Sequence, residues 1–279
     1  MTASMTPIWL CADDYGISPA VSKAIRELIE RGRLNATSVM VVALALDRDE
    51  AAALSALVSG GRRAAIGLHV TLTGRFKPMS AGYRPVRGGC FVSLTEMMVR
   101  GSLRLLNRDK LTAEITNQFK AFKDLFGRAP DFVDGHQHSH LFPQIREAFL
   151  DVAKQQAPQA WVRQCGRAVG VPRADYKAGI LDVLSRRFRK LAAQRGVRTN
   201  PAFAGTYVFN ATPSPDFAKL FPGFLTNLPP KSVVMCHPGF VDAELVRVDP
   251  LTSLREREFA YLASDVFPAV LRTRNVTLA

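Results

Sequence analysis

Residues 8–29, IWLCADDYGISPAVSKAIRELI, contain a short apolar run, a pair of aspartates and then a helical pattern. Residues 8–12 are typical of a buried strand, and Ser18-Pro19 is typical of a helix N-cap followed by proline at the first helical position. Apolar side chains then recur at helical spacing until a glycine ends the helix. The stretch therefore predicts one βα unit with the aspartate pair at the carboxyl end of its strand.

The same alternation of apolar runs and helical patterns continues along the chain. Further strands are expected at residues 38–45, 65–73, 131–135, 160–165, 205–210 and 232–236. Further helices are expected at residues 50–58, 94–99, 111–126, 143–155, 214–225 and 252–263. About seven βα units with no internal repeat and no linker predict a parallel sheet with right-handed crossovers. At 279 residues, we expect one α/β domain that forms a distorted, TIM-barrel-like (β/α) barrel rather than an open doubly wound sheet.

Two segments interrupt this alternation. Residues 74–110 are rich in glycine and proline, and residues 175–205 begin with a strongly basic stretch, 175–198, whose apolar side chains share one helical face. We interpret both as insertions that shape a pocket at one end of the barrel. The sequence leaves two interpretations of the basic stretch open: a helix packed on the barrel, or a basic amphipathic helix on an anionic membrane surface.

Composition narrows the class of protein. The chain carries 37 Lys and Arg against 24 Asp and Glu, a formal net charge of +13, which favours anionic partners. Nucleic-acid binding is not expected, because the arginines are not interleaved with stacking aromatics and no reader motif is present. No dinucleotide or P-loop signature follows the first strand. No signal peptide or membrane span is recognisable and the four cysteines form no CxxC pair, so we expect a soluble, cytoplasmic protein, either monomer or homodimer.

Side chains that bind metals lie at or near the carboxyl ends of four of the expected strands. They are Asp13 and Asp14, His69, Asp134 with His136, and His237. Functional groups of βα barrels lie at the carboxyl ends of the strands, so these side chains are expected to meet. Imidazole and carboxylate ligands suit zinc and similar divalent ions, which lower the pKa of a bound water. A second carboxylate can then take the proton of the water, and an imidazole opposite can protonate the leaving group.

Four motifs resemble those of the YdjC-like carbohydrate deacetylases, a family that includes chitooligosaccharide deacetylases and hopanoid-associated deacetylases. They are ADDYGIS at residues 12–18, GLHVTLT at 67–73, DGHQHSHLFP at 134–143 and HPG at 237–239. The motifs occur in the order of the family and span most of the chain, so together they are highly specific. Gly135 and Gln137 depart from the commoner serine and histidine of the third motif, although neither position carries a ligand in this assignment.

The resemblance implies a distorted βα barrel related to the NodB-type deacetylases, and hydrolysis of an N-acetyl group on an amino sugar with release of acetate. It also assigns a role to each candidate residue. Asp14, His69 and His136 would hold one divalent ion, zinc or magnesium; Asp13 would be the general base; His237 would be the general acid or an oxyanion stabiliser; and His138, His140 and Tyr15 would line the substrate pocket.

Several alternatives stay open at this point. The substrate is either an N-acetylated oligosaccharide or a glycolipid, and the basic stretch would suit the lipid-linked form. Another barrel metallohydrolase, such as a phosphoesterase, would also use a metal site and would benefit from the positive charge. A non-catalytic carbohydrate- or lipid-binding protein would not require the full set of acid, base and ligand candidates. The histidines at residues 136–140 could also be a surface tract that sequesters metal.

Overall fold

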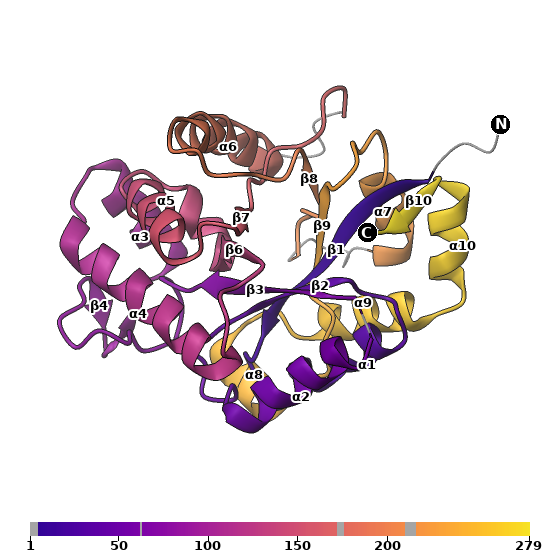
Figure 1. Ribbon diagram of the computed structural model, residues 1–279, viewed down its shortest axis with the longest axis horizontal. Coiled ribbons are helices and arrows are strands. Elements are labelled where there is room, and N and C mark those ends of the chain that lie inside the picture. The colour runs from indigo at the N-terminus through magenta and orange to yellow at the C-terminus, as the bar shows by residue number, and fades with distance from the viewer. Residues whose placement is uncertain (1–4, 62, 172–175, 210–215) are drawn as a thin grey trace.

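The computed structural model describes residues 5–61, 63–171, 176–209 and 216–279, and a curled parallel sheet lies at its centre (Figure 1). The strand order in the sheet is β7-β6-β3-β2-β1-β9-β8. These strands are β1 (Thr6–Tyr15), β2 (Ala36–Val39), β3 (Ala65–Val70), β6 (Phe132–Gly135), β7 (Trp161–Val162), β8 (Phe203–Ala204) and β9 (Val233–Cys236). A further strand, β10 (Val276–Leu278), runs parallel to the first residues of β1.

The sheet forms a half-barrel. Its two edge strands, β7 and β8, share no ladder in the described parts of the chain, although Val162 makes an isolated parallel bridge with Thr199. Nearby, the backbone N–H of Phe203 donates to the carbonyl of Gly166 at 2.9 Å. The expected distorted (β/α) barrel is therefore confirmed, with its opening between β7 and β8.

Helices surround this sheet. They are α1 (Pro19–Glu30), α2 (Arg48–Ser59), α3 (Leu94–Ser102), α4 (Arg108–Phe126), α5 (Ile145–Gln156), α6 (Tyr176–Gln194), α7 (Phe217–Phe224), α8 (Ala243–Val248), α9 (Ser253–Ala263) and α10 (Val266–Thr273). The side chain of Ser18 accepts a hydrogen bond from the backbone of Val21 at 3.3 Å, so the expected N-cap of α1 is confirmed. In α4, Ile115, Phe119 and Phe122 form the buried face that the apolar spacing predicts.

Several expected strands are wrong in extent. The first strand is longer than residues 8–12, the strand expected at 65–73 ends at Val70, and the strand expected at 160–165 covers only Trp161–Val162. The apolar run at residues 38–45 continues β2 only to Val39, and hydrogen bonds from Ala43 to Met40 and from Leu46 to Ala43 then form successive turns. The expected strand at 205–210 lies instead at Phe203–Ala204, and residue 210 is outside the described residues. Gly205 follows with φ of +101°, where a Cβ atom would meet the Met235 carbonyl oxygen at 2.1 Å, so the chain turns away from the sheet. The sequence did not predict α8, α10 or β10.

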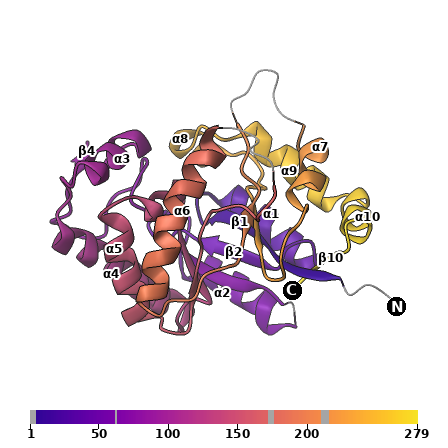
Figure 2. The same ribbon diagram turned by 90° about the horizontal axis from the view of Figure 1, so that it is seen from above.

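Both insertions fold into ordered elements. The first contains α3 and a small antiparallel hairpin of β4 (Val86–Arg87) and β5 (Cys90–Phe91). The basic stretch forms α6, which lies on the side of the sheet opposite α1 and α2 (Figure 2). Phe188 and Ala192 of α6 are fully buried, as in the packed-helix interpretation. In the described parts of the chain, no helix has the length and apolar character needed to cross a membrane.

Candidate active site

A break in the regular geometry of β1 brings the aspartate pair to one end of the sheet. The register between β1 and β2 shifts between Ala12 and Tyr15, and Asp14 has a left-handed backbone with φ of +68°. Consecutive side chains of a regular strand point to opposite faces. Because the chain departs from strand geometry at Asp14, the side chains of Asp13 and Asp14 both line the same cavity.

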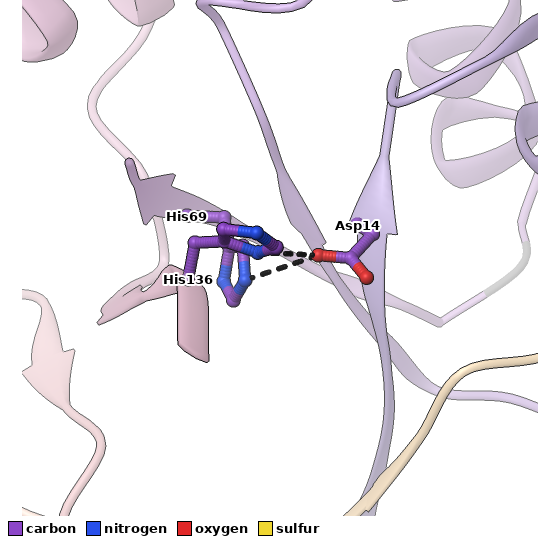
Figure 3. A group of neighbouring side chains, drawn as sticks. All are labelled: Asp14, His69 and His136. Carbon is purple, nitrogen blue, oxygen red and sulfur yellow. Dashed lines mark hydrogen bonds and ion pairs between the residues drawn. The ribbon is translucent and has the colours of Figure 1, made fainter. Parts of the chain in front are cut away.

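Asp14, His69 and His136 form a buried cluster (Figure 3). Oδ1 of Asp14 lies 3.4 Å from Nε2 of His69 and 3.0 Å from Nδ1 of His136. The three side chains come from the ends of β1 and β3 and from the first residue of the 3-10 helix η1 (His136–Leu141). One ligand atom from each residue lies within 4.8 Å of the others, and two imidazoles with one carboxylate fit a divalent ion such as zinc.

Asp134 contacts Nδ1 of His69, the ring nitrogen that does not face Asp14, and so orients the ring. Nδ1 of His69 lies 2.6 Å from Oδ1 of Asp134 and 2.9 Å from Oγ of Ser38, and this leaves Nε2 facing Asp14. A carboxylate that orients a ligating histidine in this way is a common feature of metal sites. Burial opposes a charge on His69, but Asp134 raises its pKa to about 10. The contact with Asp134 therefore favours a proton on Nδ1 of His69.

Arg163, which directly follows β7, forms an ion pair with Asp13. Its Nη1 and Nη2 donate to the two carboxylate oxygens of Asp13 at 2.6 and 2.7 Å, and Nη2 also lies 2.6 Å from Oδ2 of Asp134. Burial opposes ionisation of Asp13, but the guanidinium of Arg163 holds the pKa of this carboxyl below its usual range. Cys11, Asp13 and Asp134 also lie close enough together to hold a metal, but the guanidinium of Arg163 contacts all three.

Arg255 of α9 forms an ion pair with Asp14. Its Nη2 donates to Oδ2 of Asp14 at 2.7 Å and to Oδ2 of Asp249 at 2.9 Å. The side chain of Arg255 is completely buried. The two aspartates of the pair are therefore each ion-paired to a different buried arginine, which sequence analysis did not predict.

His237 lies at the carboxyl end of β9. Its backbone N–H donates to Oε2 of Glu258 at 2.5 Å, while Nδ1 is buried and has no hydrogen-bond partner among the described residues. Burial lowers the pKa of the His237 ring, which favours the neutral imidazole. The hydroxyl of Tyr207 donates to Oε1 of Glu258 at 2.5 Å, and burial raises the pKa of this carboxyl to about 7.

Five of these side chains line a cavity of about 590 Å³, and we call them its floor. The floor is defined as Asp13, Asp14, His69, His136 and His237. Two walls come from the insertions: α3 contributes Leu94, Thr95 and Met98, and α6 contributes Ile180, Leu181 and Leu184. Several apolar side chains of α6, the helix formed by the basic stretch, therefore line the cavity. Both insertions line the pocket, as the sequence analysis expected.

Of the three predicted pocket residues, His138 lines the cavity, whereas His140 and Tyr15 lie in the interior. Gln137 and His138 have left-handed backbones and line the cavity. His140 is buried behind it, where Nε2 donates to the carbonyl of Arg163 at 2.8 Å. Tyr15 is also buried, and its hydroxyl donates to the Glu50 carboxylate. Neither His140 nor Tyr15 is among the residues that line this cavity, and their predicted contact with substrate stays a prediction.

The position of His140 leaves little room for a side chain at residue 135. A Cβ atom at Gly135 would lie 2.8 Å from Nδ1 and 3.0 Å from Cβ of His140. A serine at residue 135 would therefore collide with the present position of the ring. Glycine at this site allows the imidazole to pack against the end of β6, between Phe149 and Phe188.

Residues 7–273 match the family model described as YdjC-like protein. The chain belongs to the YdjC-like family. Among its relatives is a chitooligosaccharide deacetylase of Escherichia fergusonii, which is 30% identical over 232 residues that cover 83% of this chain and 81% of the relative. A chitooligosaccharide deacetylase of Salmonella paratyphi B is 26% identical over 264 residues, covering 94% of this chain and 93% of the relative.

Solved structures share the fold of this YdjC-like chain. A protein from Enterococcus faecalis V583, provisionally named for cellobiose-phosphate cleavage, superposes with a TM-score of 0.77 at 22% identity and covers 99% of this chain and 97% of its own. A lactam utilization protein from Thermus thermophilus superposes with a TM-score of 0.55 at 12% identity, with 98% of each chain covered. At these identities the likeness concerns the fold alone.

Proposed function

We propose that this protein is a metal-dependent carbohydrate N-deacetylase, a hydrolase that removes the acetyl group from an N-acetylated amino sugar. The observation that carries the proposal is the cluster of Asp14, His69 and His136 in a cavity that Asp13 and His237 also line. The relatives named chitooligosaccharide deacetylase support the type of reaction and the class of substrate.

Each floor residue has a role in this proposal. Asp14 through Oδ1, His69 through Nε2 and His136 through Nδ1 are the ligands of one divalent ion. Such an ion lowers the pKa of water toward ~7, so that hydroxide is available near neutral pH. Asp13, kept ionised by Arg163, accepts a proton from the attacking water.

His237 acts on the other side of the scissile amide. As a neutral imidazole it donates an N–H to the carbonyl oxygen as negative charge develops there; once it has taken up a proton during the reaction, it gives one to the leaving amine. Asp134 holds the Nδ1 proton of His69 and so keeps Nε2 available as a ligand. The two-imidazole donor set favours zinc over magnesium, because magnesium prefers oxygen ligands.

The experiment measures acetate released from chitooligosaccharides by the purified protein, before and after chelation and after addition of zinc or magnesium. We expect acetate release that is lost with chelator and restored by the metal. The residues lining the described cavity include no lysine or arginine to hold a phosphate, so phosphate release from phosphoesters is the negative control. Metal-dependent phosphate release without acetate release would contradict the proposal.

We further propose a lipid-linked amino sugar as the preferred substrate. The walls offer Leu94, Met98, Ile180 and Leu184, which suit an apolar group attached to the sugar. The outer face of α6 exposes basic side chains suited to peripheral contact with an anionic membrane. They are Arg186, Arg187, Arg189 and Lys190.

A substrate comparison and a binding assay test this refinement. We expect a higher kcat/KM for an N-acetylglucosaminyl lipid than for a chitooligosaccharide. We also expect binding to vesicles that contain anionic lipid and weaker binding to neutral vesicles. Equal kcat/KM values and no vesicle binding at low salt would leave the oligosaccharide as the substrate.

A further inference from the structure

The two carboxylate oxygens of Asp14 have different surroundings. Oδ1 faces the imidazoles, at 3.0 Å from Nδ1 of His136 and 3.4 Å from Nε2 of His69. Oδ2 instead accepts a hydrogen bond from Nη2 of Arg255 at 2.7 Å. One oxygen of the carboxylate therefore faces the ligand cluster, and the other faces the buried guanidinium of Arg255.

Arg255 is itself held in place by several contacts. Its Nη2 also donates to Oδ2 of Asp249 at 2.9 Å, and its Nε donates to the backbone carbonyl of Leu251 at 2.9 Å. Its own carbonyl accepts from the backbone N–H of Gly239, close to His237, at 3.1 Å. A fully buried guanidinium with these partners cannot follow the Asp14 carboxylate if that group rotates.

We propose that Arg255 is a positioning residue that makes Asp14 a one-oxygen ligand, and that it thereby disfavours large, oxygen-seeking cations such as Ca²⁺. Calcium takes six to eight oxygen ligands and often binds a carboxylate through both oxygens. Zinc is satisfied by four ligands, of which one carboxylate oxygen can be one. The inference rests on the proposed metal site and concerns the selectivity of that site.

The physical reason is the competition for Oδ2. A hydrogen bond between a guanidinium and a carboxylate is charge-assisted, and in a buried site it is costly to break. A cation that needs both oxygens of Asp14 must displace Arg255 from Oδ2. A cation that needs only Oδ1 leaves the ion pair intact. Arg163 exerts no such effect on Asp14, because its guanidinium is directed to Cys11, Asp13 and Asp134.

The test compares dissociation constants for Zn²⁺ and Ca²⁺ in the full-length unaltered protein, in R255M and in R255K, measured by calorimetry on metal-free protein. We expect R255M to bind Zn²⁺ about 10- to 100-fold more weakly, the usual effect of losing a partner of a metal ligand. We expect its affinity for Ca²⁺ to fall less or to rise, so that the preference for Zn²⁺ narrows by at least about tenfold. In R255K the ammonium group keeps the positive charge and can donate to Oδ2 of Asp14, but it lacks the planar guanidinium fork, so the preference for Zn²⁺ should narrow only in part.

The outcomes separate this inference from the proposed function. An unchanged ratio of the two dissociation constants in folded R255M overturns the role of Arg255, even if both affinities fall together, because a merely structural role would lower both alike. If R255M does not fold by circular dichroism, R255K decides: a narrowing of about threefold or more supports the role and an unchanged ratio overturns it. R108M, which removes a surface ion pair outside the site, is the control and should keep the ratio of the unaltered protein. Failure of the unaltered protein to bind either ion overturns the metal site and this inference together.

Discussion

The floor and the walls of the cavity are built from different kinds of residues. The floor consists of charged and imidazole side chains at strand ends, held in place by buried ion pairs such as Asp13–Arg163 and Asp14–Arg255. The walls on α3 and α6 consist mainly of apolar side chains, and some of these are partly open to solvent: Met98 is 37% exposed and Ile180 is 49% exposed. From this difference we predict that chemistry and stability depend on the floor and that the choice of substrate depends on the walls. Substitutions in the two regions should therefore change different measured quantities.

The largest effect is expected for Asp14→Asn in the floor. The substitution removes the negatively charged ligand of the cluster, so both the bound metal and the activity should be lost, with a decrease in kcat/KM on the order of 10³-fold or more. Metal content is measured by atomic emission and activity by acetate release. A variant that retains a full complement of metal and full activity would exclude Asp14 as a ligand.

Asp13→Asn should separate catalysis from metal binding within the same floor. The amide cannot act as a general base, so activity should fall by about 10²- to 10⁴-fold. Asp13 is paired to Arg163 rather than grouped with Asp14, so the metal content should stay that of the unaltered protein. Full activity in this variant would refute the assignment of Asp13 as base.

Arg163→Met tests how much the floor contributes to folding. The change leaves Asp13 and Asp134 buried without their shared counter-charge, and loss of one partner from a buried ion pair costs about 3–5 kcal/mol. Urea denaturation should show this decrease in the free energy of unfolding. Arg108→Met is the control, because the Arg108–Asp151 pair lies at the surface, where such pairs contribute about 0–1 kcal/mol. Equal losses in the two variants would contradict the proposed importance of the floor.

Glu258→Gln tests, through the pH dependence of stability, the buried carboxyl that accepts a hydrogen bond from the backbone of the floor residue His237. Below about pH 4.5 Glu258 is protonated in both folded and unfolded chains; between that pH and about 7 it loses its proton first in the unfolded chain. The stability that this carboxyl contributes at low pH is therefore lost as pH rises through 7. Between pH 4.5 and pH 7, the free energy of unfolding of the glutamine variant should therefore rise by about 3 kcal/mol relative to that of the unaltered protein. This value corresponds to about 1.4 kcal/mol per unit of pKa shift. If the difference in the free energy of unfolding between the variant and the unaltered protein is the same at pH 4.5 and at pH 8, the pKa of Glu258 is not raised.

Sequence patterns predict the floor better than the walls, for a physical reason. Strand ends of a βα barrel meet at one face whatever the loops do, so the positions of Asp14, His69 and His136 along the chain were sufficient to predict their meeting. The partners of these residues could not be predicted in the same way. Arg163 interrupts an apolar run, which signals a buried charge without naming its partner. Arg255 lies in the charged run SLRERE, where it cannot be told from a solvated side chain.

The walls depend on contacts between segments far apart in the chain. The spacing of apolar residues in α6 predicts an amphipathic helix, but it does not say whether the apolar face meets the core or a cavity. In the structure it does both: Phe188 is buried in the interior, whereas Ile180 and Leu184 line the cavity. The apolar run after β2 misled the prediction similarly, because Val41 and Ala43 are buried in turns rather than in a strand.

The smallest effect is expected in the walls, for Leu184→Ser. This side chain lines the cavity without belonging to the floor, so its loss should remove binding energy that the bound substrate and the transition state share. Such a loss raises KM and leaves kcat unchanged. For a lipid-linked substrate, about 1.4 kcal/mol of lost apolar contact corresponds to an increase in KM of about tenfold. Val183→Ser, on the same helix but outside the cavity lining, should leave KM unchanged. A decrease in kcat for Leu184→Ser at constant KM would mean that the wall takes part in the chemistry, and the division between floor and walls would then fail.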